Sequence, residues 1–346
     1  MEPSQAIAER THSGYVLFTA EPQPIKCVLM VRDKKNEATI KAYLGLVDSF
    51  EEATDQRIPQ ARQRVQEIRR GGRLNPSLHA VVHQAAEAMR KGDALGCYRA
   101  LKWVESNALE VRHESIRAIS PNGSPACVEA IKHMHNDETK DAFGRRAEIY
   151  ETTQAEIEPY ASAVQEVLNW VATVDPLMHE EMIAIVSEAI IFRAQALMGG
   201  SLVRTFGSVY IGSPDHDPLR KELGEQFNIG TVPYFMEHLV HETSHNVLYA
   251  LMDLDPMVLN PVNERYTAPL RTDLRPIYGI YHACFVLSRM VRVFRLLDAR
   301  GEPDYARLIK HFVPRLKYGL QMLKQHARMT DTGRNLYETF AVCAGL

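Results

Sequence analysis

The chain has 346 residues, of which 45% are apolar and 24% charged, as in an ordinary soluble globular protein. Its 40 basic and 43 acidic residues give a formal net charge of −3, which excludes a nucleic-acid binder that depends on a strongly basic surface. The apolar runs are shorter than the roughly 20 residues that span a bilayer. The 5 scattered cysteines form no CxxC pair, so we expect neither a disulfide framework nor a cysteine zinc site.

The first residues of the chain resemble no secretory signal. Met1–Gln5 lacks the basic start and apolar core of a signal peptide, so we expect a cytoplasmic protein. Two short apolar runs follow, at Tyr15–Phe18 and Cys27–Val31, with prolines at 22 and 24 between them. This pattern predicts two short strands around a turn.

The rest of the sequence is mainly helical in pattern, with one clear strand predicted at Leu202–Ile211. We therefore expect a mainly α (α+β) fold, a helical bundle with a small antiparallel sheet. A composition break favours an N-terminal, mostly helical region over 1–125 and a C-terminal catalytic region over 126–346. Helices are predicted at 36–70, 76–91, 93–106, 125–135, 144–173, 176–198, 232–253, 276–298, 303–328 and 333–345.

The motif with the clearest chemistry is His241-Glu242-Thr243-Ser244-His245, an HExxH sequence within an apolar helical stretch. Residues four apart share one face of a helix, so His241 and His245 can direct both imidazoles at one metal ion. Glu242 lies about 100° around the helix and can reach a metal-bound water. The alternative is two core histidines and a surface glutamate. His238, one turn earlier, suits a supporting or substrate-side position.

A third metal ligand must come from further along the chain, and two residues compete for that place. Glu264 follows His245 at the spacing of gluzincin-type zinc peptidases, although prolines at 261 and 269 make its surroundings a loop. His282 lies nearly two turns into a helix that begins after Pro276, among apolar residues. An isolated histidine there is often a core residue, but the nearby metal helix favours a ligand.

A group of charged residues precedes the His282 helix. Arg271, Asp273 and Arg275 form either a solvated loop with an internal ion pair or a clamp for a carboxylate cosubstrate, which guanidinium geometry suits. The sequence favours neither interpretation.

Together these motifs resemble the HExxH-type 2-oxoglutarate-dependent peptide β-hydroxylases, which act on ribosomally made, post-translationally modified peptides. The resemblance covers about residues 200–295. It rests on the HExxH motif, then Ala-Pro-Leu-Arg-x-Asp-x-Arg-Pro at 268–276, then Gly-Ile-Tyr-His-Ala-x-Phe-Val-Leu at 279–287. The resemblance implies a zincin-like metal helix, a mononuclear Fe(II) site, and hydroxylation of a peptide or amino-acid β-carbon that consumes O2 and 2-oxoglutarate.

Carried onto this sequence, the resemblance makes His241, His245 and His282 the metal ligands. Arg275, with Arg271 in reserve and Asp273 beside it, would bind the distal carboxylate of 2-oxoglutarate. Glu242 would orient a ligand or metal-bound water and not act as a general base. Most oxygenases of this chemistry use two histidines and one carboxylate, and a three-histidine site would depart from that pattern.

Two other functions remain open. A zinc metallopeptidase would use Glu242 as general base and Glu264 as third ligand. A non-enzymatic helical module would use the 36–135 helices to dock a peptide or partner. For the enzyme, the strand at 202–211 offers an edge for an extended peptide. The sequence identifies neither the substrate residue nor an oligomeric state.

Overall fold

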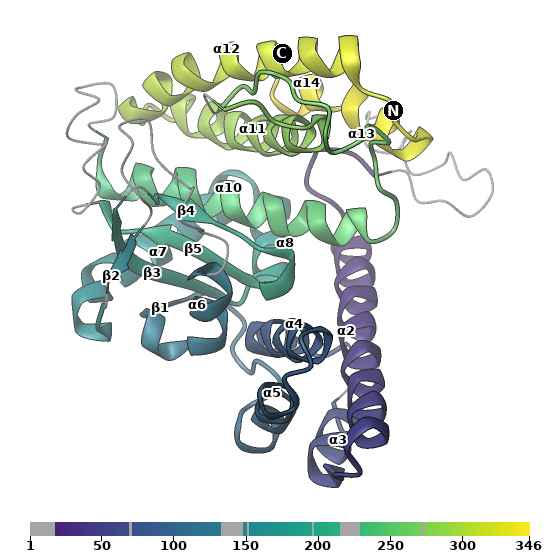
Figure 1. Ribbon diagram of the computed structural model, residues 1–346. Helices are drawn as coiled ribbons and strands as arrows, with labels where there is room; N and C mark the ends of the chain where they lie inside the picture. Colours follow the sequence, from purple (N-terminus) through teal and green to yellow (C-terminus); the bar gives the residue numbers. More distant parts are fainter. Residues whose placement is uncertain are drawn as a thin grey trace.

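A computed structural model of the chain describes residues 18–68, 71–132, 148–150, 152–195, 197–214, 229–270 and 273–346. Helices dominate the described part, and a small sheet lies among them (Figure 1). The helices are α2 (Ile25–Thr54), α3 (Pro59–Gln66), α4 (Pro76–Arg90), α5 (Ala94–Ser106), η1 (Pro121–Gly123), α6 (Pro125–Lys132), α7 (Gln154–Val174), α8 (Pro176–Ile185), η2 (Val203–Thr205), α10 (Thr231–Met252), α11 (Ile277–Asp298), α12 (Pro303–His326), α13 (Asp331–Glu338) and α14 (Phe340–Cys343). The strands are β1 (Arg117–Ile119), β2 (Glu148–Tyr150), β3 (Glu188–Gln195), β4 (Gly199–Gly200) and β5 (Ser208–Gly212).

Several helices begin where local side-chain chemistry satisfies their free N–H groups. The Asn75 side chain accepts a hydrogen bond from the Ser77 backbone N–H at the start of α4, and Pro76 occupies the first turn. At α7, Thr153 and Glu156 form a reciprocal capping box. These caps replace the hydrogen bonds that the first turn of a helix lacks, so the sequence marks the helix starts locally.

Three expectations from the sequence are wrong. The strand expected at 202–211 begins only at Ser208, because Val203–Thr205 form the short helix η2. Cys27–Val31 is helical, inside α2, while Tyr15–Val16–Leu17 of the other expected strand lies outside the described residues. The helix expected at 176–198 ends at Ile185, and the chain continues as β3. The apolar run through Ile190 and Ile191 is a buried strand, which periodicity alone does not distinguish from a buried helix.

The sheet is mixed, and the expectation of an antiparallel sheet is wrong. Its order is β1-β3-β5-β4, with β1, β3 and β5 parallel and β4 antiparallel to β5. β2 pairs antiparallel with the far end of β3. Parallel neighbours require crossover connections, and here α7 and α8 lie in the chain between β1 and β3.

The two faces of the sheet belong to different parts of the core. Ala189, Ile191, Val209 and Ile211 belong to the large cluster that also contains residues of α7, α8, α10 and α11. The alternate residues, including Ile190 and Tyr210, pack with residues of α4 and α6. Successive strand side chains point to opposite faces, so the sheet is buried on both sides. α10 lies between the sheet and the α11–α12 pair (Figure 1).

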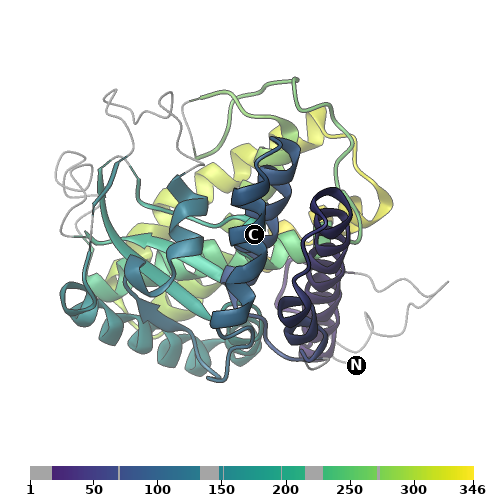
Figure 2. The same cartoon turned by 60° about the horizontal axis from the view of Figure 1, so that its bottom comes forward.

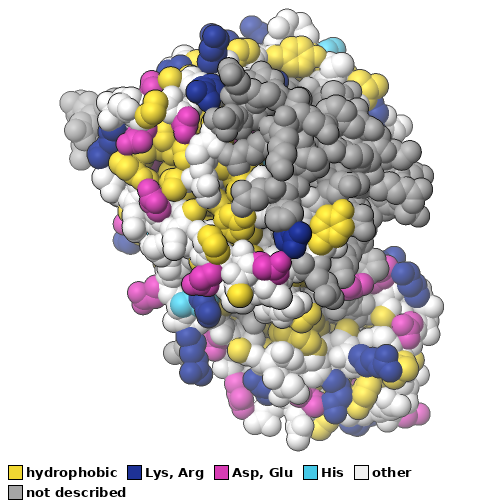
Figure 3. Space-filling model, turned by 90° about the vertical axis from the view of Figure 1, so that its left-hand side faces the viewer, with side chains coloured by type: hydrophobic (Ala, Val, Ile, Leu, Met, Phe, Trp, Pro, Cys, Tyr) yellow, Lys and Arg dark blue, Asp and Glu magenta, His cyan; other side chains and the backbone are white. Residues whose placement is uncertain are grey.

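A separate apolar cluster holds the N-terminal helices together. Residues from Tyr43 to Leu109 form it, contributed by the second half of α2 and by α3, α4 and α5. Figure 2 shows α4 and α5 in front and α12 on the opposite side of the molecule. In Figure 3 this part forms the lower lobe, over which basic and acidic side chains are interspersed.

Candidate metal centre

The helix that carries the HExxH motif is fixed to the sheet by polar contacts. The Asn246 side chain accepts from the backbone N–H of Gly207 at 2.9 Å and donates to the carbonyl of Ser208 at 3.2 Å. The hydroxyl of Tyr234 donates to the carbonyl of Gly212 at 2.8 Å. These bonds join α10 to both ends of β5, so the motif is held on a rigid element.

A buried ion pair supports the same helix from the other side. Arg289 of α11 and Glu181 of α8 pair with each other, and both side chains are almost fully buried. The Arg289 Nε–H donates to the Ser244 hydroxyl at 3.1 Å, and the backbone N–H of Gln23 donates to Glu181 at 3.0 Å. The HExxH helix, two further helices and the N-terminal segment therefore meet at one charged pair.

The structure brings His241, Glu242 and His245 together. A ligand atom from each lies within 4.8 Å of the other two, a spacing that suits one metal ion. Glu242 Oε1 lies 4.0 Å from His241 Nε2. The His241 side chain is 25% exposed and that of Glu242 only 7% exposed. The imidazoles thus form the accessible side of the group and the carboxyl its buried side.

Glu242 is held by the segment that follows β4. The Ser201 hydroxyl donates to Glu242 Oε2 at 2.9 Å, and the Tyr249 hydroxyl donates to the Ser201 carbonyl at 3.1 Å. Gly199 lies so close that a Cβ there would stand 3.1 Å from Glu242 Oε1 and 3.0 Å from the Tyr210 carbonyl oxygen. Burial raises the pKa of Glu242 to about 8, against the opposing effect of the Ser201 hydrogen bond.

His282 lies beside His245, and its contacts determine which ring nitrogens carry protons. His282 Nε2 lies 3.0 Å from Met252 Sδ, and because a thioether sulfur only accepts, this contact is a hydrogen bond in the tautomer that has its proton on Nε2. In a neutral ring, His282 Nδ1 is then an acceptor. It lies 3.3 Å from His245 Nδ1, which must donate. This leaves His245 Nε2 with a free lone pair, the form in which imidazole binds a metal.

The histidines of this site are neutral at physiological pH. Burial is the main cause that lowers the pKa values of His245 and His282 to about 3. The pKa of His241 is also well below its usual value, through burial and then the neighbouring His245 and His238. Each ring therefore offers a lone pair, not a positive charge, to a cation. His238 bonds to the Tyr234 carbonyl and stacks on its ring.

The charged residues expected to complete the site lie in another environment. The Glu264 carboxylate accepts from Asn260 and Tyr266 and pairs with Arg328, so the structure does not bring it to the histidines. These hydrogen bonds, chiefly that of Asn260, lower the pKa of Glu264.

The expected carboxylate clamp is only partly described. Arg275 Nε lies 2.9 Å from Asp273 Oδ2, and both side chains are substantially exposed. The backbone of Arg275 exchanges two hydrogen bonds with Tyr266 just before α11. Arg271 lies outside the described residues. The pair of Asp273 and Arg275 fits the ion-pair interpretation, and its role in cosubstrate binding stays a prediction.

Sequence reasoning missed four residues that shape the site: Ser201, Tyr249, Met252 and Arg289. Tyr249 and Met252 follow His245 on the same helix, four and seven positions later, so helical periodicity could have indicated them. Ser201 and Arg289 reach α10 from distant positions in the chain, and no local pattern marks them.

No known protein-family model matches this chain, and no curated protein matches it either. None of the helices in the described part combines the length and the apolar character needed to cross a lipid bilayer.

Proposed function

We propose that the chain is an Fe(II)- and 2-oxoglutarate-dependent oxygenase that hydroxylates a β-carbon of a peptide or peptide-like substrate. The convergence of His241, Glu242 and His245 within 4.8 Å is the observation that carries this proposal. Two histidines and one carboxylate with open positions form the donor set typical of non-haem Fe(II) oxygenases. In this proposal Glu242 is itself the carboxylate ligand, whereas the resemblance gave it only an orienting role. Bound there, Fe(II) would supply the oxidation of the C–H bond with O2 and 2-oxoglutarate.

The residues present fit a divalent cation. Two neutral imidazoles and one carboxyl face one point, and the carboxyl is buried without a cationic side chain at hydrogen-bond distance among its described contacts. A cation would favour the ionised form of Glu242, and binding would then release its proton. His241 would use Nε2, the nitrogen nearer Glu242, and the tautomer of His245 leaves its Nε2 free.

In this proposal His282 orients His245 and is not itself a ligand. Its Nδ1 accepts the His245 proton, which fixes both the tautomer and the direction of that ring. The three-histidine site expected from the resemblance is the alternative. Replacing His282 by glutamine distinguishes the two roles. Loss of an orienting residue would lower the metal affinity about 10–100-fold, whereas loss of a ligand would lower it as much as His245→Ala does.

In this proposal Arg275 binds the far carboxylate of a dicarboxylate cosubstrate. It lies two residues before α11, the helix that carries His282. The guanidinium is 35% exposed, and its partner Asp273 is 52% exposed. A cosubstrate carboxylate would replace Asp273 as the partner of the guanidinium.

An extended substrate would pair with β4. Of the strand expected to offer a free edge, at 202–211, only the part from Ser208 onward forms β5, which lies inside the sheet between β3 and β4. β4 instead forms the edge, and its Gly199 lies against Glu242 and His238. A peptide added there would pass beside the accessible imidazoles.

The zinc peptidase alternative loses its third ligand, because Glu264 is engaged with Asn260, Tyr266 and Arg328. A peptidase would still need Glu242 as general base. The hydroxylase would consume O2 and 2-oxoglutarate, whereas the peptidase would release cleaved peptide.

The deciding experiment is an anaerobic reconstitution with Fe(II), followed by O2 and 2-oxoglutarate and mass spectrometry of candidate peptides, including those encoded by neighbouring genes. The proposal predicts formation of succinate and a peptide gaining one oxygen atom. Peptide cleavage with zinc alone, independent of 2-oxoglutarate and abolished by Glu242→Gln, would establish the peptidase instead.

A further inference from the structure

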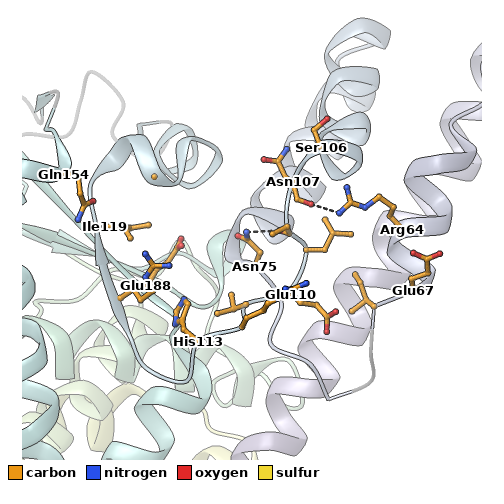
Figure 4. Close-up of a pocket in the computed structure, with 17 residues that line it drawn as sticks. Arg64, Glu67, Asn75, Ser106, Asn107, Glu110, His113, Ile119, Gln154 and Glu188 are labelled. Atoms are coloured by element: carbon orange, nitrogen blue, oxygen red, sulfur yellow. Dashed lines mark hydrogen bonds between the residues drawn. The ribbon is translucent and has the colours of Figure 1, made fainter.

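Two regions far from the histidines carry many charged side chains, and they differ in sign balance. The first is a cavity of about 1570 Å³ between the N-terminal helices and the sheet (Figure 4). Its lining includes three arginines and three glutamates: Arg64, Arg112, Arg117, Glu67, Glu110 and Glu188. Because neither sign is in excess, this cavity does not select a charged ligand. The second region is the outer face of α12, on the opposite side of the molecule (Figure 2).

The charges of α12 are almost all positive. Between Tyr305 and Thr330 the sequence has six basic residues and no acidic one. Lys310, Lys317 and Lys324 recur every seven residues, so they share one face of the helix, and all three are exposed. α12 lies in the outermost helical layer, beyond α11 (Figure 1). A positive stripe therefore follows the surface of a chain whose formal net charge is −3.

A loop is fixed by hydrogen bonds against the C-terminal end of α12. We call residues 259–263 the Val262 loop. The Asn260 side chain donates to the His326 carbonyl at 2.9 Å and accepts from the Arg328 N–H at 2.7 Å. The Leu259 N–H donates to the Arg328 carbonyl at 2.7 Å. Because the loop is already ordered, binding through it would cost little conformational entropy.

The Val262 loop carries a group of exposed apolar side chains. Leu259 is 58% exposed and Val262 is 71% exposed. Pro261, between them, is exposed as well. Single exposed apolar residues are normal on a protein surface, whereas apolar residues that gather at one place mark an interaction site. Three such residues within four positions of an ordered loop therefore indicate a contact that the fold itself does not provide.

The charges around the Val262 loop favour an anionic partner. Arg265 and Lys324 are exposed and form no ion pair with a described residue. Glu264, the acidic residue nearest the loop in sequence, pairs with Arg328. The negative charge of Glu264 is thus balanced within the fold, while the two exposed cations add to the positive stripe of α12.

We propose that the Val262 loop and the positive face of α12 bind the surface of an anionic lipid bilayer. Leu259 and Val262 enter the interfacial region, and the lysine ammonium groups remain at the lipid phosphates. Lysine dominates the exposed stripe of α12, although lysine is depleted in interfaces between proteins, where arginine and aromatic residues are enriched. The composition therefore favours a lipid surface over a partner protein. This binding is peripheral and does not depend on the metal centre.

The test is co-sedimentation of the full chain, without added metal, with vesicles of phosphatidylcholine with or without phosphatidylserine. We expect binding that requires phosphatidylserine. Lys317→Glu/Lys324→Glu should weaken it at least about tenfold, since each cation near an anionic surface contributes about fivefold. The matched control is Lys41→Glu/Arg99→Glu, which makes the same change in net charge at exposed positions of α2 and α5. It should leave the affinity unchanged.

Insertion of the apolar side chains is tested separately. Leu259→Ser/Val262→Ser should weaken binding about tenfold or more, because less apolar surface leaves water. Leu95→Ser is the control, since Leu95 on α5 is also 58% exposed. It should bind like the wild type. All these positions are exposed, so the variants should fold normally, which thermal denaturation verifies.

Four results would overturn the proposal. The chain could fail to bind vesicles that contain phosphatidylserine, or it could bind pure phosphatidylcholine equally well. The charge variant or the apolar variant could bind as tightly as its control. Finally, a single-stranded oligonucleotide that displaces the vesicles at equal concentration would identify the positive stripe as a nucleic-acid surface.

Discussion

The HExxH group on α10 and the charged loop at 264–275 were both candidates for the active site, and they differ in how their charges are satisfied. In the loop, Glu264 and Asp273 each have an arginine partner and stand partly in solvent. On α10, Glu242 is buried with a serine hydroxyl as its hydrogen-bond partner. In the described part of the loop both carboxylates have a cationic partner, whereas the carboxyl on α10 has only the serine hydroxyl.

This difference supports Glu242 over Glu264 as the carboxylate ligand in the proposed metal site. A carboxylate that already accepts three contacts gains little by moving to a metal, whereas a buried carboxyl beside two neutral imidazoles gains its charge partner there. Support for the two regions also differs, because α10 rests on a buried ion pair and the loop pair lies at the surface.

The largest effect is expected at that buried ion pair. Arg289→Met leaves Glu181 buried without its partner and should reduce the free energy of unfolding by about 3–5 kcal/mol. Urea denaturation measures this loss. The double variant Arg289→Met/Glu181→Met should recover much of it, since no uncompensated charge remains. A single variant as stable as the wild type would show that the pair does not support α10.

Ser201→Ala should act on the metal group with a smaller effect. It removes the only hydroxyl that donates to Glu242 within the described contacts, so Glu242 is less well oriented. We expect an affinity for Fe(II) lower by about 10–100-fold, measured by anaerobic titration. Ser49→Ala, at an exposed serine of α2, is the control. Equal affinities for Fe(II) in the two variants would show that Ser201 does not orient Glu242 for metal binding.

The pH dependence of stability can be tested at His79, a buried histidine outside the metal group. Burial lowers its folded-state pKa to about 3, and its Nδ1 bonds to the Thr39 hydroxyl at 2.8 Å. Between this pKa and the unfolded value near 6.5, only the unfolded chain binds the proton. Acidification below pH 6.5 therefore costs stability at about 1.4 kcal/mol per pH unit from this residue.

His79→Gln removes that proton uptake. Its stability deficit relative to the wild type should shrink by about 2 kcal/mol between pH 7 and pH 5 in urea denaturation. Ser49→Ala, at an exposed position of α2, changes no titratable group and serves as control, so its difference from the wild type should be the same at both pH values. A deficit for His79→Gln that does not change with pH would mean that His79 is protonated in the fold.

The smallest effect is expected in the loop. Asp273→Asn breaks an exposed ion pair and should change the free energy of unfolding by at most about 1 kcal/mol, less at high salt. Thermal denaturation at low and high ionic strength measures it. A loss as large as that of Arg289→Met would erase the distinction between the two regions.

The sequence predicted the parts of the site that are local. His241 and His245 share a helical face four residues apart, and α4, α10, α11 and α12 lie close to their expected bounds. Contacts between distant segments could not be predicted from the sequence, because no local pattern links Ser201 to Glu242 or Arg289 to Ser244. β3 was mistaken for helix because a continuous apolar run fits either buried element. The tautomer of His282 was inferred from the contact with Met252, which the sequence does not reveal.

The central claim is tested most directly by metal content after anaerobic dialysis against Fe(II). The account predicts about one iron per chain in the wild type, and none in His241→Ala/His245→Ala. The double variant His311→Ala/His326→Ala, which removes two histidines of α12, should retain the iron. A wild-type chain without bound metal, or equal iron in the first variant and the wild type, would contradict the account.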